Sequence, residues 1–191
     1  MIEKGELVTL SDDEIMGKVR QGNIAAFTEL FNRYKSEIIN FIYRQCGDYG
    51  KAEDITQECF LRIYHNAGSY KSKGKFRNWA LTIALNATRS LLVKKDEKNR
   101  PLNLDFDIAD KTVTLEKIIE KKEAETIIQD ALNKLPAEQK EIIILRHYHD
   151  LKFSEIANIL DCPVETVKSR MRYGLLKLLE LLKGTGYEYK M

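Results

Sequence analysis

Apolar residues recur every three or four positions along most of the chain, which is the spacing of one face of an α-helix. The longest such stretch covers residues 24–46, and the same spacing predicts helices over about 52–67, 76–94 and 115–135. The alternation with a period of two that indicates strands is not found. The apolar positions are Ala26, Phe27, Leu30, Phe31, Tyr34, Ile38, Phe41 and Ile42 in the first helix, Ile55, Cys59, Ile63 and Ala67 in the second, and Trp79, Ile83, Ala87 and Leu91 in the third. The pattern therefore predicts an all-α protein.

Capping signals predict further, shorter helices. Ser11 and Glu14 fit a capping box, in which the serine accepts from first-turn amides and the glutamate reaches back to the serine. Pro136 suits the first position of a helix, because its missing amide hydrogen would have no helical partner there. These shorter helices are predicted over residues 12–20, 136–148, 154–160 and 163–182.

The helical periodicity is lost between residues 96 and 113, where Pro101 also interrupts the chain. Such a stretch is typical of a flexible linker. We therefore expect two small helical domains, one over residues 1–95 and one over residues 114–191, joined by a linker over residues 96–113.

Net charge says little about partners, because the 191 residues sum to only +2. The distribution of charge is more informative. Residues 89–100 hold five basic and two acidic side chains, and residues 168–183 hold five basic side chains against Glu180 alone. Two separate basic clusters favour two contacts with a polyanion, although a charge run can also be a solvated helix face.

The remaining candidate chemistry argues against an enzyme. Cys46, Cys59 and Cys162 are widely spaced and match no ligand pattern, as expected of reduced thiols in the cytoplasm. His147 and His149 lack a third ligand, and no phosphate-binding glycine loop or nucleophile elbow is present. The acidic start is unlike a signal peptide, and the apolar runs are too short to span a bilayer. We therefore expect a cytoplasmic protein without membrane insertion, catalytic residues, metal ion or cofactor.

Residues 153–178 carry the features of a helix-turn-helix. Two short helices that cross steeply need a small residue where they touch, and Ala157 supplies it. Asp161 occupies the turn, where the left-handed conformation is required and aspartate is tolerated better than most residues. Pro163 then starts the second helix, with Glu165 in its first turn, where a negative charge suits the helix dipole.

The second helix of this motif separates into two faces. The inward face is apolar, and the outward face carries hydroxyl, basic and aromatic groups that suit phosphates and base edges in a major groove. The alternative is a helical hairpin with a solvated basic face. The inward residues are Val164, Val167, Met171, Leu175 and Leu178, and the outward residues are Thr166, Lys168, Ser169, Arg172 and Tyr173.

Several motifs resemble the sigma factors of bacterial RNA polymerase. Leu135-Pro136, the run at 142–146 and the segment 153–172 resemble sigma region 4. The segments 26–31, 52–62 and 76–86 resemble sigma region 2. Their order and spacing are similar to those of the extracytoplasmic-function (ECF) group, which has only these two domains. The resemblance implies a region 2 helical bundle and a region 4 helix-turn-helix in a factor that directs transcription initiation.

In such a factor, region 2 binds the polymerase and the −10 promoter element. The resemblance implies that the helix over 52–67 docks on the clamp helices of the largest polymerase subunit. It also implies that the segment 70–76 and the following helix bind the −10 element as single-stranded DNA. The docking residues would be Asp54, Gln57, Glu58 and Leu61, and the −10 residues would be Lys71, Lys73, Lys75, Phe76, Asn86, Arg89 and Ser90.

Region 4 of the family reads the −35 element and contacts the polymerase flap region. The five outward residues of the helix-turn-helix would read that element here. The sequence departs from the family at Arg172-Tyr173-Gly174, where a second arginine is common, so Tyr173 replaces a forked donor. The resemblance further implies an anti-sigma factor as a partner.

Two other functions fit parts of the sequence. A stand-alone helix-turn-helix regulator would use residues 1–95 for ligand binding or dimerisation and would bind a palindrome as a dimer. A structural adaptor would use the first helical domain alone, which leaves the outward face over 166–173 unexplained. Binding to core polymerase separates the sigma factor from both.

Overall fold

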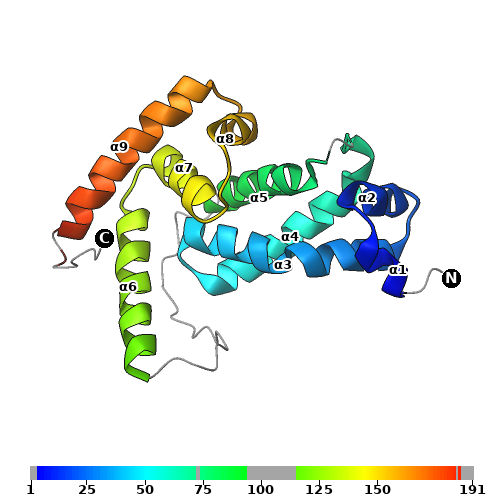
Figure 1. Ribbon diagram of the computed structural model, residues 1–191, viewed down its shortest axis with the longest axis horizontal. Helices are drawn as coiled ribbons and strands as arrows, with labels where there is room; N and C mark the ends of the chain where they lie inside the picture. Colours follow the sequence, from blue (N-terminus) through cyan, green and yellow to red (C-terminus); the bar gives the residue numbers. More distant parts are fainter. Residues whose placement is uncertain (1–3, 72–73, 94–114, 184, 186–191) are drawn as a thin grey trace. The chain divides into compact units, whose positions relative to one another are not determined.

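The computed structural model describes residues 4–71, 74–93, 115–183 and 185, and those residues form helices and turns without strands (Figure 1). The all-α prediction is confirmed. The helices are α1 (Lys4–Thr9), α2 (Asp12–Arg20), α3 (Ile24–Cys46), α4 (Tyr49–His65), the short 3-10 helix η1 (Ala67–Ser69), α5 (Phe76–Val93), α6 (Leu115–Asn133), α7 (Ala137–His147), α8 (Phe153–Leu160) and α9 (Val164–Lys183).

The chain divides into two compact units. Unit 1 comprises residues 1–43 and 50–100, and unit 2 comprises residues 44–49 and 101–191. Unit 1 therefore holds α1, α2, most of α3, α4, η1 and α5, and unit 2 holds α6 to α9. The predicted linker over 96–113 lies outside the described residues, so the predicted domain boundaries stay a prediction.

Aromatic contacts join the long helices of unit 1. The ring of Phe31 on α3 lies 4.7 Å from that of Phe60 on α4. The ring of Tyr34 lies 4.9 Å from that of Phe76, the first residue of α5. The stripe predicted on α4 is buried as expected, with Ile55, Cys59, Ile63 and the following Ala67 all at most 4% exposed. These contacts hold α4 and α5 so that each keeps one face directed away from the core.

The helix α1 was not predicted from the sequence. The Arg33 guanidinium on α3 donates to the carbonyls of Leu7 and Val8, each at 2.9 Å. It also donates to the Leu10 carbonyl at 2.9 Å and to Asp12 Oδ1 at 3.0 Å. Because the last carbonyls of a helix lack partners within it, this side chain stabilises the end of a six-residue helix. The stabilising group is more than twenty residues away, so local pattern does not reveal it.

Unit 2 packs α7 and α8 against α9. The apolar run Ile142–Leu145 of α7 is buried throughout. Gly174 of α9 faces this run, and a Cβ built there would lie 3.0 Å from Ile143 Cδ1 and 3.1 Å from Gln139 Cβ. The two helices therefore approach so closely that a side chain at position 174 would require its neighbours to shift by a few tenths of an ångström. This close approach fixes the rotation of α9 about its axis.

Three predictions of detail were wrong. Pro136 caps α7 with an extended ψ of 139° and the helix starts at Ala137, one residue later than predicted. Pro163 likewise precedes α9, which begins at Val164. On α5, Trp79 and Ile83 are only half-buried. The most deeply buried residues of that helix are Phe76, Ala80, Leu81, Ala84, Leu85, Ala87 and Thr88, so the buried face is rotated from the predicted stripe.

Candidate nucleic-acid interface

The helix-turn-helix prediction is confirmed in its turn. Asp161 adopts the left-handed conformation, with φ 51° and ψ 52°. The Cys162 amide donates to the Ala157 carbonyl at 3.1 Å, which closes the end of α8. Ala157 itself is 7% exposed, as expected for the small contact residue. After this turn, α9 begins in a different direction from α8. One face of the amino-terminal half of α9 is exposed to solvent.

The outward face of α9 holds the predicted residues. Lys168, Ser169, Arg172 and Tyr173 are exposed, and Thr166 is half-buried. Lys168 Nζ pairs with Glu165 Oε1 at 2.7 Å, and the Ser169 hydroxyl donates to the Thr166 carbonyl at 3.0 Å. The opposite residues Val167 and Met171 are at most 7% exposed. A helix with one packed face and one basic, hydroxyl-bearing face has the geometry needed for a major groove.

Farther along, the same face of α9 becomes apolar. Leu176 and Leu179 follow Arg172 at helical spacing and are 56% and 53% exposed. Neither leucine was predicted from the sequence to lie on this exposed face. Their spacing from Arg172 was the available signal, because positions four and seven residues apart lie on one helix face.

A second polar face lies on α5 in unit 1. Asn86, Arg89 and Ser90 are exposed, and Arg89 and Ser90 follow Asn86 by three and four positions. The Ser90 hydroxyl donates to the Asn86 carbonyl at 2.8 Å. Lys75 is exposed immediately before the helix. These residues form a surface of amide, guanidinium, hydroxyl and ammonium groups, which suits both phosphates and base edges.

Two further −10 residues were predicted, Lys73 and Phe76. Lys73 lies outside the described residues. Phe76 is 1% exposed, and its ring packs near those of Tyr70 at 5.9 Å and Trp79 at 6.0 Å. The Phe76 ring therefore supports the segment in front of α5 from inside the core rather than from the surface.

The exposed face of α4 combines acidic and apolar groups. Asp54 and Gln57 are exposed, and Leu61 is 54% exposed. Glu58 Oε1 pairs with Arg62 Nε at 2.7 Å, one turn along the helix. An exposed leucine one turn from a carboxylate on the same helix face suits a protein-docking surface.

The described residues offer little for other chemistry. No group of three histidine, cysteine, aspartate or glutamate side chains is placed to hold a metal ion there. Burial raises the pKa of the Cys59 thiol to about 12, so this thiol stays protonated and is a poor nucleophile. Within the same part of the chain, no helix combines the length and apolar character needed to cross a bilayer.

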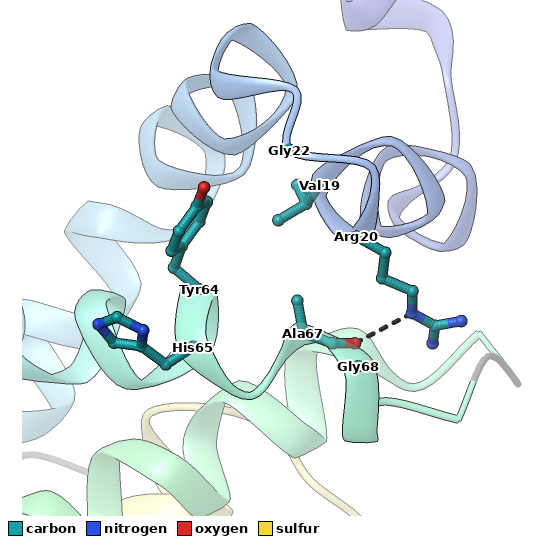
Figure 2. A pocket seen from close by; sticks show the side chains of 7 residues that line it. All are labelled: Val19, Arg20, Gly22, Tyr64, His65, Ala67 and Gly68. Carbon is teal, nitrogen blue, oxygen red and sulfur yellow. Dashed lines mark hydrogen bonds between the residues drawn. The ribbon is translucent and has the colours of Figure 1, made fainter.

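A pocket of about 330 Å³ lies in unit 1 between α2 and the end of α4 (Figure 2). It is lined by Val19, Arg20, Gly22, Tyr64, His65, Ala67 and Gly68. Arg20 Nε donates to the Ala67 carbonyl at 3.0 Å on one side of it. This guanidinium is thereby engaged with the backbone of η1.

Comparisons with known proteins match the two units separately. The description "Sigma-70 region 2" matches residues 30–97, and "Sigma-70, region 4" matches residues 125–178. The ECF RNA polymerase sigma factor SigW of Bacillus subtilis is 32% identical over 175 residues, covering 87% of this chain and 94% of SigW. The ECF RNA polymerase sigma-E factor of Haemophilus influenzae is 30% identical over 173 residues, covering 85% of this chain and 90% of that factor. In fold, the chain is similar to the sigma factor RpoE of Bartonella quintana, which was solved in complex with the anti-sigma factor NepR. The TM-score is 0.66 and the sequence identity is 23%, and the match covers 82% of this chain and 96% of RpoE.

Proposed function

The chain belongs to the extracytoplasmic-function sigma factors of bacterial RNA polymerase, and from this we propose which surfaces carry out promoter recognition. Sigma factors are non-enzymatic initiation factors that bind core polymerase and promoter DNA. The proposal is that α9 reads the −35 element, that α5 and the segment before it bind the −10 element, and that α4 docks on the polymerase. The observation that carries it is the pair of polar faces on α9 and α5, each opposite a buried face and each on a different unit.

The −35 assignment rests on the direction in which α9 presents its side chains. Val167 and Met171 are buried, so Lys168, Ser169 and Arg172 face away from the core. An arginine can donate two parallel hydrogen bonds to one guanine, whereas a lysine is a point charge suited to a phosphate. Arg172 is therefore the proposed base reader and Lys168 the proposed phosphate anchor. Thr166 and Tyr173 flank them, and we propose that the Tyr173 ring packs against a thymine methyl or a sugar.

The −10 assignment rests on the exposed face of α5. Initiation requires unpaired bases, and a protein that does not hydrolyse ATP must replace lost stacking with contacts of its own. Asn86 offers an amide for a base edge, with Arg89 and Ser90 within one turn of it. Lys75 offers phosphate attraction where the strand would approach α5, and we propose the same for Lys73.

The partners follow from the family. We propose that Asp54, Gln57, Glu58 and Leu61 dock on the clamp helices of the largest polymerase subunit and that unit 2 contacts the flap region. We also propose an anti-sigma factor as a regulator, supported by the similarity in fold to a sigma factor solved with one. The chain would act in the cytoplasm, without enzymatic activity of its own.

The test of polymerase docking uses Leu61→Ala with core polymerase. Leu61 is 54% exposed, so the interface would cover about half of this side chain, and losing that contact should cost about 1–2 kcal/mol of binding, or about 5- to 30-fold in affinity. The matched control is Val8→Ala, which shortens a similarly exposed apolar side chain of the same unit. Equal core affinity for the two variants would contradict docking through α4.

DNA binding and initiation, measured with and without core polymerase, separate a sigma factor from a stand-alone helix-turn-helix regulator. A sigma factor directs initiation only as a complex with core polymerase. A stand-alone regulator would bind its duplex site as a dimer without the polymerase. Tight dimeric binding of the free chain to a palindromic site, with no initiation from a matched promoter, would contradict the proposed function.

A further inference from the structure

Tyr70 and Gly74, which lie between η1 and α5, are each bound by one carboxylate from α2. The Tyr70 hydroxyl donates to Asp13 Oδ1 at 2.5 Å. The Gly74 backbone amide donates to Asp13 Oδ2 at 2.8 Å. Tyr70 and Gly74 lie 57 and 61 residues from Asp13 in the sequence, so these contacts exist only in the folded unit.

Arg20, at the other end of α2, adds a second attachment. Its Nε donates to the Ala67 carbonyl, as Figure 2 shows, and its Nη2 donates to the Tyr70 carbonyl. Asp13 and Arg20 are seven residues apart, which is about 10 Å along a helix. The helix α2 therefore attaches to η1 and to Tyr70 from two well-separated side chains.

The local structure favours these bonds. Gly74 adopts a φ of +62°, a conformation that suits glycine and that directs its amide to Asp13. Tyr70 is 3% exposed, and its ring lies 5.1 Å from that of Trp79. Burial and the hydrogen bond to Asp13 raise the pKa of Tyr70 well above its usual range, so the phenol remains a donor at physiological pH. Asp13 lies in the first turn of α2, where the helix dipole favours a negative charge.

The residues attached in this way lie next to two lysines of the predicted −10 segment. Lys71 directly follows Tyr70, and Lys75 directly follows Gly74, and both lysines are exposed. Residues that are already held in place lose less conformational entropy when DNA binds than residues that the DNA must order. Holding Tyr70 and Gly74 in place therefore favours binding at Lys71 and Lys75.

We propose that Asp13 is a positioning residue for −10 recognition, acting through Tyr70 and Gly74 to fix Lys71 and Lys75 before the DNA strand arrives. This inference rests on the proposed function of the segment and of α5. It assigns a role in DNA binding to α2, although neither Asp13 nor Arg20 would contact the DNA. Both side chains act by holding residues next to the proposed DNA contacts.

The experiment compares Asp13→Ala and Tyr70→Phe with Glu14→Gln in the full chain. Glu14 is an exposed acid of the same turn, and it bonds to Ser11. Tyr70→Phe removes only a hydroxyl, so it remains informative if Asp13→Ala folds poorly. The first readouts are amide exchange at Gly74 and the fluorescence of Trp79, which is the single tryptophan of the chain.

The second readout is the affinity of each holoenzyme for a promoter whose −10 region is already unpaired. We expect Asp13→Ala to lose protection at Gly74, to shift the Trp79 emission and to bind about tenfold more weakly. Tyr70→Phe should show the same changes to a smaller degree, because the Gly74 bond remains. Glu14→Gln should match the parent protein in every readout, and core affinity should be unchanged in all three variants.

Two further variants separate this inference from the function on which it rests. Lys75→Ala and Asn86→Ala remove proposed DNA contacts directly. If both bind the unpaired promoter as well as the parent, the proposed −10 function is wrong and the role of Asp13 falls with it. If both bind weakly while Asp13→Ala binds normally, the −10 function stands and the positioning role of Asp13 is overturned. Unchanged protection at Gly74 in Asp13→Ala would overturn the positioning role as well.

Discussion

Lys168 and Arg172 should contribute to −35 recognition in different ways, although both are basic and lie one turn apart on α9. Each Lys or Arg that neutralises a DNA phosphate releases counterions, so the dependence of affinity on salt becomes steeper by about 0.9 in log-log slope per contact. Lys168→Ala should therefore reduce the magnitude of the salt slope by about one and weaken all promoters by a similar factor.

The helix supplies a close control for this measurement. Lys168 pairs with Glu165 at 2.7 Å, and Lys177 pairs with Glu180 at 2.9 Å, both with an i,i+3 spacing and about half-exposed lysine side chains. Lys177→Ala therefore removes the same charge and the same kind of surface pair. Because Lys177 lies more than two turns beyond Lys168 and off the face of Arg172, its loss should leave the salt slope nearly unchanged.

Arg172→Ala should instead change which base is preferred. Losing a bidentate contact to guanine costs about 1–3 kcal/mol, which is about 5- to 150-fold at the base it reads and little elsewhere. The assay is selection from a promoter library randomised over the −35 element, with each variant holoenzyme, followed by salt titration on the parent promoter. Unaltered base preferences with Arg172→Ala, together with an altered preference with Lys168→Ala, would show that reader and anchor are reversed. Equal slope changes for Lys168→Ala and Lys177→Ala would refute a local phosphate contact.

Two more predictions concern the fold. Gly174→Val should lower the stability of unit 2 by about 1–3 kcal/mol, because its Cβ would lie 3.0 Å from Ile143 Cδ1 and 3.1 Å from Gln139 Cβ. Thermal unfolding measures this, and Gly17→Ala on α2, where the added Cβ meets nothing within 4 Å, should not destabilise the chain. Brief proteolysis should cut within residues 96–113 and leave two folded helical fragments. A melting temperature unchanged by Gly174→Val would contradict the packing prediction. Cleavage outside residues 96–113 would contradict the linker prediction.

The parts of the fold that the sequence predicted well depend on short-range patterns. The bounds of α3 match the prediction at both ends, because apolar spacing runs through Ile24–Cys46 without a break. Asp161 adopts the expected left-handed conformation. This conformation was predictable because it depends on the residue type at that one position. The outward residues of α9 were predictable for the same reason, since one packed face determines the opposite one.

The rotation of α5 could not be predicted in this way. Apolar residues surround most of that helix, so a periodic pattern fits more than one face. Trp79 and Ile83 were expected in the core, but they are half-buried, and Ala80, Leu81, Ala84 and Leu85 occupy it. The role of Asp13 was beyond prediction for a different reason, since its partners lie 57 and 61 residues away and carry no local signal.

If the DNA contacts are divided between two units as proposed, the affinity for a promoter depends on both units together. The proposed −35 face lies on α9 in unit 2, and the proposed −10 face lies on α5 in unit 1. Each face is only a few turns of one helix, so either contact alone should be weak. When one unit is bound to the promoter, binding of the second unit becomes intramolecular. The extent of that second binding depends on an effective concentration, which is set by the connection between the units and by the polymerase that holds both. A change such as Arg172→Ala should then weaken promoter binding by no larger factor in holoenzyme than in an isolated second unit, because the contact of unit 1 still holds the complex on the DNA.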